Sequence, residues 1–143
     1  MVEILDETAQ FPAPDRLQAA IQRLLAEADL GDRDVTIVLI GDEAMRERNR
    51  ADRGIDGPTD VLSYPTHEPD DDGFPAVPHL GDILIDVDQA RRQAPDHGLD
   101  PLDEVLVLAA HGLTHLRGYD HVDDDAWIPF HEAQRAVLRD ADT

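Results

Sequence analysis

Helical and extended patterns of apolar residues alternate along this chain. The apolar residues that recur at helical spacing near the N-terminus are Leu17, Ile21, Leu24, Leu25 and Ala28. They predict an amphipathic helix that starts at Pro14 or Asp15 and ends before Gly31. Short apolar runs, several rich in β-branched residues, predict strands. The runs with this pattern span residues 2–5, 35–41, 61–64 and 82–86.

Helices and loops connect these runs. Residues 42–49 open with acidic side chains, which suit the positive end of a helix. Residues 86–94 follow a helical pattern up to Pro95, whose ring ends or kinks a helix. The glycines and proline of residues 51–60 predict a loop, and the four prolines and Asp cluster of residues 65–80 predict a surface loop.

A long, largely buried central helix is predicted over residues 100–118. Asp100 is expected to cap its start, Pro101 to occupy its first position and Gly118 to stop it. A last helix is predicted over residues 125–139. The length of 143 residues then fits a single α+β domain over the whole chain, with a small mixed sheet of about four strands packed against helices.

Composition limits the chemistry and the location. The chain contains no cysteine, so any metal would be held by imidazole and carboxylate groups. No stretch approaches the roughly 20 apolar residues of a membrane span, so no membrane partner is expected. The N-terminus is acidic where a signal peptide would be basic, and the cytoplasm is therefore the expected location.

The chain is strongly acidic. Its 32 acidic residues against 12 basic ones give a formal net charge of −20, and every basic residue is arginine. Taken alone, this charge argues against a nucleic-acid partner unless positive charge is concentrated locally. It also suggests a protein that works in concentrated salt, where counterions screen the repulsion between carboxylates.

The segment HGLTHLRGYDH, residues 111–121, holds three of the seven histidines. His111 and His115 are four residues apart on the predicted central helix, so they project from one face close enough to share an ion. Gly118 breaks the helix, which allows His121 to approach from another direction. Three imidazoles suit Zn²⁺ and leave a fourth tetrahedral position for water or substrate. We therefore predict one catalytic Zn²⁺ per chain, held by these three histidines, which activates water for attack on a phosphoryl or carbonyl group.

The same spacing matches the zinc-protease pattern of metzincins, H-x-x-x-H-x-x-G-x-x-H. In those proteases the residue after the first histidine is a glutamate that acts as the general base, whereas here it is Gly112. A protease without that carboxylate would be crippled. A metzincin-like metalloprotease is therefore kept only as an alternative function.

The histidine segment also resembles the zinc motif of the YbeY-type endoribonuclease family, which is close to H-G-x-L-H-L-x-G-Y-D-H. Residues 49–65, NRADRGIDGPTDVLSYP, resemble the second motif of that family, and residues 80–86, LGDILID, resemble its Gly-Asp strand. The three blocks occur in the family's order and cover most of the chain from about Arg48 to the C-terminus. Thr114 and Tyr64 stand where the family usually has Leu and Phe, and neither is a matched ligand.

The resemblance implies a metal-dependent hydrolase, an endoribonuclease specific for single-stranded RNA. It further implies a role in ribosomal RNA processing, notably maturation of the 3′ end of small-subunit RNA, and in ribosome quality control. The implied partners are single-stranded RNA and ribosomal RNA or the small ribosomal subunit. A non-catalytic, metal-stabilised ribosome assembly factor is a second alternative, which a closed site with four protein ligands would favour.

Positive charge is concentrated before the second motif. Four of the 12 basic residues lie close together there: Arg46, Arg48, Arg50 and Arg53. Ion pairs with Glu43 and Glu47 are the expected role of Arg46 and Arg48. Arg53 falls in the predicted loop and matches the family's active-site arginine. Its guanidinium fork suits a phosphodiester oxygen, so Arg53 is the predicted catalytic residue, which orients and neutralises the phosphate.

Other polar residues have weaker indications. Glu104 lies seven residues before His111 on the same helical face, where a structural and a functional role both stay open. Asp82 and Asp120 are candidates to orient the ligand imidazoles through hydrogen bonds. The remaining histidines are expected to have no role: His67, His79, His97 and His131.

Salt is expected to stabilise this protein, because it screens the repulsion that a net charge of −20 creates in the compact state. The midpoint of urea unfolding should rise between about 0.1 M and about 2 M KCl, where the Debye length falls from roughly 10 Å to under 3 Å. A midpoint that stays constant or falls over this range would contradict the prediction.

Overall fold

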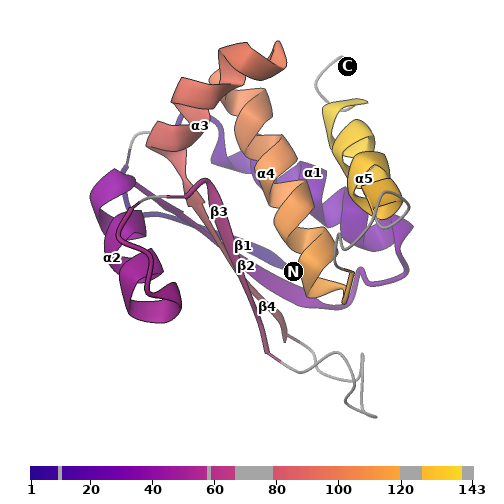
Figure 1. Ribbon diagram of the computed structural model, residues 1–143. Coiled ribbons are helices and arrows are strands. Elements are labelled where there is room, and N and C mark those ends of the chain that lie inside the picture. The colour runs from indigo at the N-terminus through magenta and orange to yellow at the C-terminus, as the bar shows by residue number, and fades with distance from the viewer. Residues whose placement is uncertain (10, 58, 67–78, 120–126, 140–143) are drawn as a thin grey trace.

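A four-stranded sheet forms the centre of the structure, with helices on both of its faces (Figure 1). The computed structural model describes residues 1–9, 11–57, 59–66, 79–119 and 127–139. Within these residues, none of the helices is both long enough and apolar enough to cross a membrane. In chain order, the elements are β1 (Val2–Asp6), α1 (Pro14–Glu27), β2 (Asp34–Ile40), α2 (Asp42–Arg53), β3 (Val61–Pro65), β4 (His79–Asp86), α3 (Val87–Gln93), the short 3₁₀ helix η1 (Ala94–His97), α4 (Pro101–Leu116) and α5 (Ile128–Arg139).

The sheet is mixed, with the strand order β1-β2-β4-β3. β1 pairs with β2 and β2 pairs with β4 in parallel, whereas β3 pairs with β4 in the antiparallel direction and forms an edge of the sheet. A mixed four-stranded sheet packed with helices confirms the predicted α+β class.

Side chains that alternate along β2 and β4 divide the core into two layers. Ile37 of β2 and Ile83 of β4 belong to the main core, which contains buried residues of α1 and α4. Ile40 and Leu84 pack with Met45 of α2 in a smaller second cluster. Because successive side chains of a strand point to opposite faces, strands covered on both faces become continuous apolar runs. Figure 1 shows α1, α4 and α5 on one face of the sheet and α2 on the other.

The end of α2 and the start of β4 differ from the predicted ones. α2 continues past residue 49 to Arg53, so the predicted loop position of Arg53 is wrong. The helix ends there because Gly54, with φ 70°, adopts the left-handed conformation that stops helices. β4 begins at His79, so the end of the predicted surface loop is a strand. Residues 67–78 of that loop lie outside the described residues.

The end signals of the central helix are confirmed. The Asp100 side chain accepts a hydrogen bond from the backbone N–H of Asp103 at 2.8 Å, as an N-cap does. α4 ends at Leu116, and Gly118 follows with φ 96°, a conformation that favours glycine. α3 ends at Gln93, two residues before Pro95, as the proline predicted.

Three carboxylates join the N-terminal ends of α2 and α3. Asp86 is fully buried, and its Oδ1 accepts hydrogen bonds from the backbone N–H groups of Asp88 and Gln89 at 3.0 and 3.2 Å. Asp88 accepts a hydrogen bond from the backbone N–H of Asp42 at 3.1 Å, and Asp42 pairs with Arg92 at 2.7 and 2.8 Å. The carboxylate oxygens lie within 4.8 Å of one another, but each group already caps a helix or pairs with arginine.

Asp42 and Asp86 lie close together, and their pKa values shift in opposite directions. Burial, together with the neighbouring Asp42, raises the pKa of Asp86 to about 7. Hydrogen bonds from Arg92 lower the pKa of Asp42 to about 2. Between about pH 4 and the raised pKa, folded Asp86 holds a proton that the unfolded chain loses, so the free energy of unfolding falls as pH rises through this window.

The variant Asp86→Asn is expected to be more stable than the wild type at about pH 8, by about 1–3 kcal/mol, because a neutral amide replaces a buried charge and can still cap α3. At about pH 5 the gain should be smaller, since wild-type Asp86 is then protonated. Thermal unfolding at both pH values measures the difference, with the exposed Asp32→Asn as control. A variant that is less stable than the wild type at both pH values would refute this assignment.

Candidate active site

The C-terminal half of α4 places His111 and His115 side by side. Their Nε2 atoms lie 3.1 Å apart, and their ring centroids lie 4.8 Å apart. Two nitrogen ligands at about 2.0–2.1 Å from a tetrahedral Zn²⁺ would lie about 3.3 Å apart. The two imidazoles therefore converge at nearly the separation that a shared ion requires.

The backbone after α4 orients the His115 ring. Nδ1 of His115 lies 3.1 Å from the carbonyl oxygen of Tyr119, to which its N–H donates. This hydrogen bond keeps the proton on Nδ1 and leaves Nε2 with the lone pair that a metal needs. Gly118 allows the chain to turn so that the Tyr119 carbonyl faces the ring. Phe130 of α5 contacts both imidazoles, with centroid distances of 4.8 Å to each.

The third predicted ligand, His121, lies outside the described residues, as does Asp120. In the part of the chain that the structure describes, no third ligand residue groups with His111 and His115. The pair itself fits Zn²⁺, because imidazole nitrogen is a preferred ligand and the C-terminal end of a helix favours a cation. The three-histidine site stays a prediction.

Gly112 faces the sheet. A Cβ atom built on Gly112 would lie 2.7 Å from Cγ2 and 3.2 Å from Cγ1 of Ile83 on β4, which is closer than real Cβ contacts. The residue after the first histidine therefore cannot carry a side chain unless α4 moves away from β4. The glutamate that metzincin proteases have at this position does not fit here.

A cleft of about 660 Å³ contains both histidines. Its walls come from the end of α2, from β3 and from the segment after α4. The residues that line the cleft are Asp52, Arg53, Asp60, Val61, Leu62, Ser63, Tyr64, Pro65, His111, His115, Gly118 and Tyr119. The structure therefore brings Arg53 into one cleft with His111 and His115, although about 60 residues separate them in the chain.

Among the described residues, Arg53 forms no ion pair or hydrogen bond, in contrast to two of its neighbours. Arg46 pairs with Asp56 at 2.7 Å, and Arg48 lies 3.9 Å from Asp52, one helical turn away. Ion pairing of these two arginines was expected, but with other partners, Glu43 and Glu47. The loop after α2 turns back along the helix, which brings Asp56 to Arg46, a contact that helical spacing alone does not predict.

Two tyrosines line the cleft beside the histidines. The Tyr64 hydroxyl donates to Asp52 at 2.6 Å, and burial, with this bond, raises the pKa of Tyr64 to about 12. Tyr64 therefore keeps its proton at neutral pH. The guanidinium carbon of Arg48 lies 5.9 Å from the Tyr64 ring centre, and that of Arg117 lies 5.3 Å from the Tyr119 ring centre. Aromatic rings beside arginines are typical of surfaces that bind unpaired nucleotides.

Asp82 does not orient the imidazole of His111 or His115, the two predicted ligands that the structure describes. Its carboxylate lies 3.4 Å from Nε2 of His79, and it is not among the residues that line the cleft. The next residue, Ile83, contacts α4 at Gly112, so the alternation along β4 directs Asp82 to the opposite face of the sheet. For His111 and His115 the prediction is wrong, because it ignored which face of the strand packs against the helix.

Glu104 belongs to a buried polar group that was not predicted. Its side chain is 1% exposed. Nδ1 of His97 lies 2.8 Å from one Glu104 oxygen, and Nε2 of Gln93 donates to the other at 2.8 Å and to Asp60 at 3.1 Å. The Glu104 carboxylate raises the pKa of His97 through this hydrogen bond. Glu104 is thus a buried carboxyl group whose two oxygens are bonded to an imidazole and an amide.

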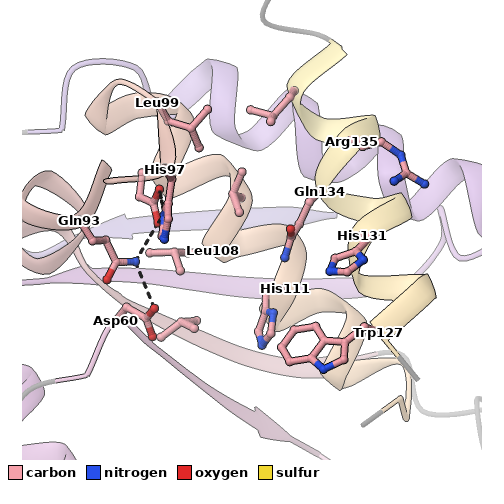
Figure 2. A pocket seen from close by; sticks show the side chains of 14 residues that line it. Asp60, Gln93, His97, Leu99, Leu108, His111, Trp127, His131, Gln134 and Arg135 are labelled. Atoms are coloured by element: carbon pink, nitrogen blue, oxygen red, sulfur yellow. Dashed lines mark hydrogen bonds and ion pairs between the residues drawn. The ribbon is translucent and has the colours of Figure 1, made fainter. Parts of the chain in front are cut away.

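This polar group lines a second pocket, of about 600 Å³, that adjoins the cleft (Figure 2). The cleft and the second pocket share Asp60, Val61 and His111. His97 and His131, which were expected to have no role, both line the second pocket. Sequence reasoning missed it because its residues come from several elements. The one available signal was Glu104, two turns before His111 on the same face of α4.

An α+β domain with converging imidazoles in a cleft is typical of metal-dependent hydrolases. Comparison with known proteins identifies the family more narrowly. The family model described as Endoribonuclease YbeY matches residues 3–142. The chain belongs to the Endoribonuclease YbeY family.

Relatives support this assignment. A Thermus thermophilus protein named Endoribonuclease YbeY is 48% identical over 123 residues, which cover 86% of this chain and 87% of the relative. A Deinococcus radiodurans protein of the same name is 44% identical over 132 residues, which cover 85% of this chain and 81% of the relative. A solution structure from Thermotoga maritima matches with a TM-score of 0.71 at 24% identity, covers 99% of this chain and 92% of its own, and supports the fold.

The variant His115→Ala is expected to lose tight zinc binding, because it removes one of two converging Nε2 atoms. Calorimetric titration of metal-free protein with Zn²⁺ should show one bound equivalent for the wild type and an affinity at least about 100-fold lower for the variant. Loss of a residue that only hydrogen-bonds a ligand lowers metal affinity by about 10–100-fold, so a ligand should cost at least as much. His79→Ala, which removes an imidazole that lines neither the cleft nor the second pocket, is the control. Equal zinc affinity in both variants would contradict the site.

Proposed function

We propose that this protein is a zinc-dependent endoribonuclease that cuts single-stranded RNA. The observation that carries the proposal is the position of Arg53 in the cleft where the Nε2 atoms of His111 and His115 converge. Family membership supports the substrate class, since the curated relatives are named endoribonucleases. On the resemblance of its motifs, we assign the activity to cytoplasmic ribosomal RNA processing, at the 3′ end of small-subunit RNA, and to ribosome quality control.

The residues of the cleft have separate roles toward a phosphodiester. Zn²⁺ held by His111, His115 and His121 would supply an activated water and neutralise charge on the phosphate. Arg53, which has no competing ion-pair partner among the described residues, would place its guanidinium fork on the non-bridging phosphate oxygens. There it stabilises the charge that develops as the attacking oxygen adds to phosphorus. The Tyr119 carbonyl holds the His115 ring so that Nε2 stays available.

The position of the cleft favours a single strand as substrate. The cleft follows β3, an edge strand, and is lined by Tyr64 and Tyr119. Unpaired bases can stack on such rings, whereas the bases of a duplex present only their edges. Arg53 in the cleft and Arg117 beside Tyr119 supply local positive charge, which a protein of net charge −20 needs to bind a phosphate backbone.

The metzincin-like protease alternative has less support. Its general base would have to replace Gly112, and a side chain there would collide with Ile83. Among the described residues that line the cleft, Asp52 and Asp60 are the only carboxylates, and Asp52 already accepts a hydrogen bond from Tyr64.

The zinc-loaded protein is expected to cut a single-stranded oligoribonucleotide and to leave an RNA duplex and casein intact. Arg53→Ala should slow cleavage by about 10²–10³-fold, because it removes a donor to the developing charge, while zinc binding stays unchanged. His115→Ala should abolish both cleavage and tight zinc binding. Cleavage rates and zinc titrations on the same protein samples measure these effects.

Arg23→Ala is the matched control, because it removes the same charge from an exposed position on α1 that lines neither pocket. Cleavage that Arg53→Ala and Arg23→Ala reduce equally would contradict the role of Arg53. Cleavage of casein would restore the protease alternative. Bound zinc without any cleavage would favour the non-catalytic assembly factor.

A further inference from the structure

The second pocket is placed to receive a part of the RNA strand. It shares Asp60, Val61 and His111 with the cleft, so a strand bound at the histidines can reach it. Its volume of about 600 Å³ falls within the range of about 300–1,000 Å³ of small-molecule sites. Its lining combines apolar side chains with several polar and charged ones, and such polar groups can orient a bound ring system.

One wall of the second pocket is a chain of hydrogen bonds. Nε2 of Gln93 donates to Asp60 at 3.1 Å and to Glu104 at 2.8 Å, which uses both of its amide hydrogens. Oε1 of Gln93 accepts from Gln89 at 3.1 Å, and Nδ1 of His97 donates to Glu104. Among the described residues, Oδ1 of Asp60 receives no hydrogen bond. This wall therefore presents acceptor oxygens, and only the far nitrogen of His97 can add a donor.

The opposite wall is aromatic. Trp127, just before α5, stacks on His131 with a centroid distance of 5.7 Å and an interplanar angle of 19°. The Trp127 ring also lies 6.0 Å from the His111 ring, measured between centroids. Arg135 is exposed and adds a positive charge farther along α5. Figure 2 shows these side chains across the pocket from the hydrogen-bonded wall.

We propose that the second pocket binds one unpaired nucleobase that carries an exocyclic amino group, adjacent to the phosphate held at the histidines. The amino group donates to Asp60, and the ring lies between the polar wall and Trp127. This inference deepens the proposed function, on which it rests, because the proposed function supplies the RNA strand.

The excess of acceptors sets the preference among bases. Cytosine, adenine and guanine carry an amino group, whereas uracil has a carbonyl oxygen where cytosine has its amino group. A carbonyl facing a carboxylate leaves two acceptors without a donor, and an unsatisfied polar group in a pocket is costly. The Asp60 carboxylate is held on this wall by Gln93, which also donates to the buried Glu104.

The fluorescence of Trp127 provides a direct test, because it is the only tryptophan of the chain. The full-length zinc-loaded protein is titrated with CMP and with UMP, which differ at the group that faces the wall. CMP is expected to change the fluorescence and to bind about 10-fold more tightly than UMP, the value of one hydrogen bond. Equal binding of the two nucleotides, or no fluorescence change with either, would overturn the proposal.

The variant Asp60→Asn sharpens this test. Asparagine can still accept from Gln93 through its oxygen and then presents an amide N–H to the pocket, so the ratio of CMP to UMP affinity should fall to about one or below. Asp32→Asn makes the same change at an exposed site outside the pocket and should leave the ratio unchanged. An unchanged ratio in Asp60→Asn would overturn the role of Asp60.

Cleavage separates this inference from the proposed function. The wild type should cut an oligoribonucleotide with cytosine beside the cleavage site with a kcat/KM about 10-fold above that of its uracil counterpart, and Asp60→Asn should remove this difference. If RNA is cut without base preference, the pocket assignment fails and the proposed function stands. If CMP binds selectively but no RNA is cut, the pocket assignment stands and the proposed function fails.

Discussion

The close approach of α4 to β4 at Gly112 fixes the position of the rest of the site. Any side chain at Gly112 would meet Ile83, so glycine sets both the distance and the rotation of the helix. The Gly112 carbonyl also accepts a hydrogen bond from Ser63 of β3 at 3.4 Å. With the helix held in this way, His111 and His115, one turn apart, share the face that borders the edge of β3. The same contact leaves no room for a metzincin-type glutamate.

Many of the acidic side chains are bonded to nearby backbone N–H groups or arginines. Asp100 and Asp86 cap helices through backbone N–H groups, and Asp56 and Asp42 pair with arginines. Carboxylates that are bonded in this way are held in place, and their charge favours the N-terminal ends of helices. Arg53 is different because no described carboxylate takes its guanidinium group. A chain of net charge −20 can therefore still present positive charge to a phosphate in the cleft.

Local sequence patterns predicted the helices and strands well, but they could not predict contacts between residues far apart in the chain. The periodicity of α1 and α4, the Asp100 cap and the helix end near Gly118 are properties of neighbouring residues, so the sequence sufficed. Helical spacing likewise predicted that His111 and His115 would meet. The face on which Asp82 lies depends on how β4 packs against α4, and the contact of Gln93 with Asp60 depends on how α3 meets β3. Neither packing arrangement produces a periodic pattern in the sequence, so neither could be predicted from it.

The course of β3 at the edge of the mixed sheet explains why the cleft and the second pocket adjoin each other. β3 runs antiparallel to β4 at the sheet edge. The residues at its two ends contact different helices. Asp60, just before β3, reaches the polar wall built by α3 and α4, whereas Tyr64 near its other end reaches α2. His111 lies where these two regions meet, because it lines both the cleft and the second pocket. A nucleotide chain that follows this edge strand would therefore meet the proposed phosphate-binding and base-binding groups on either side of His111.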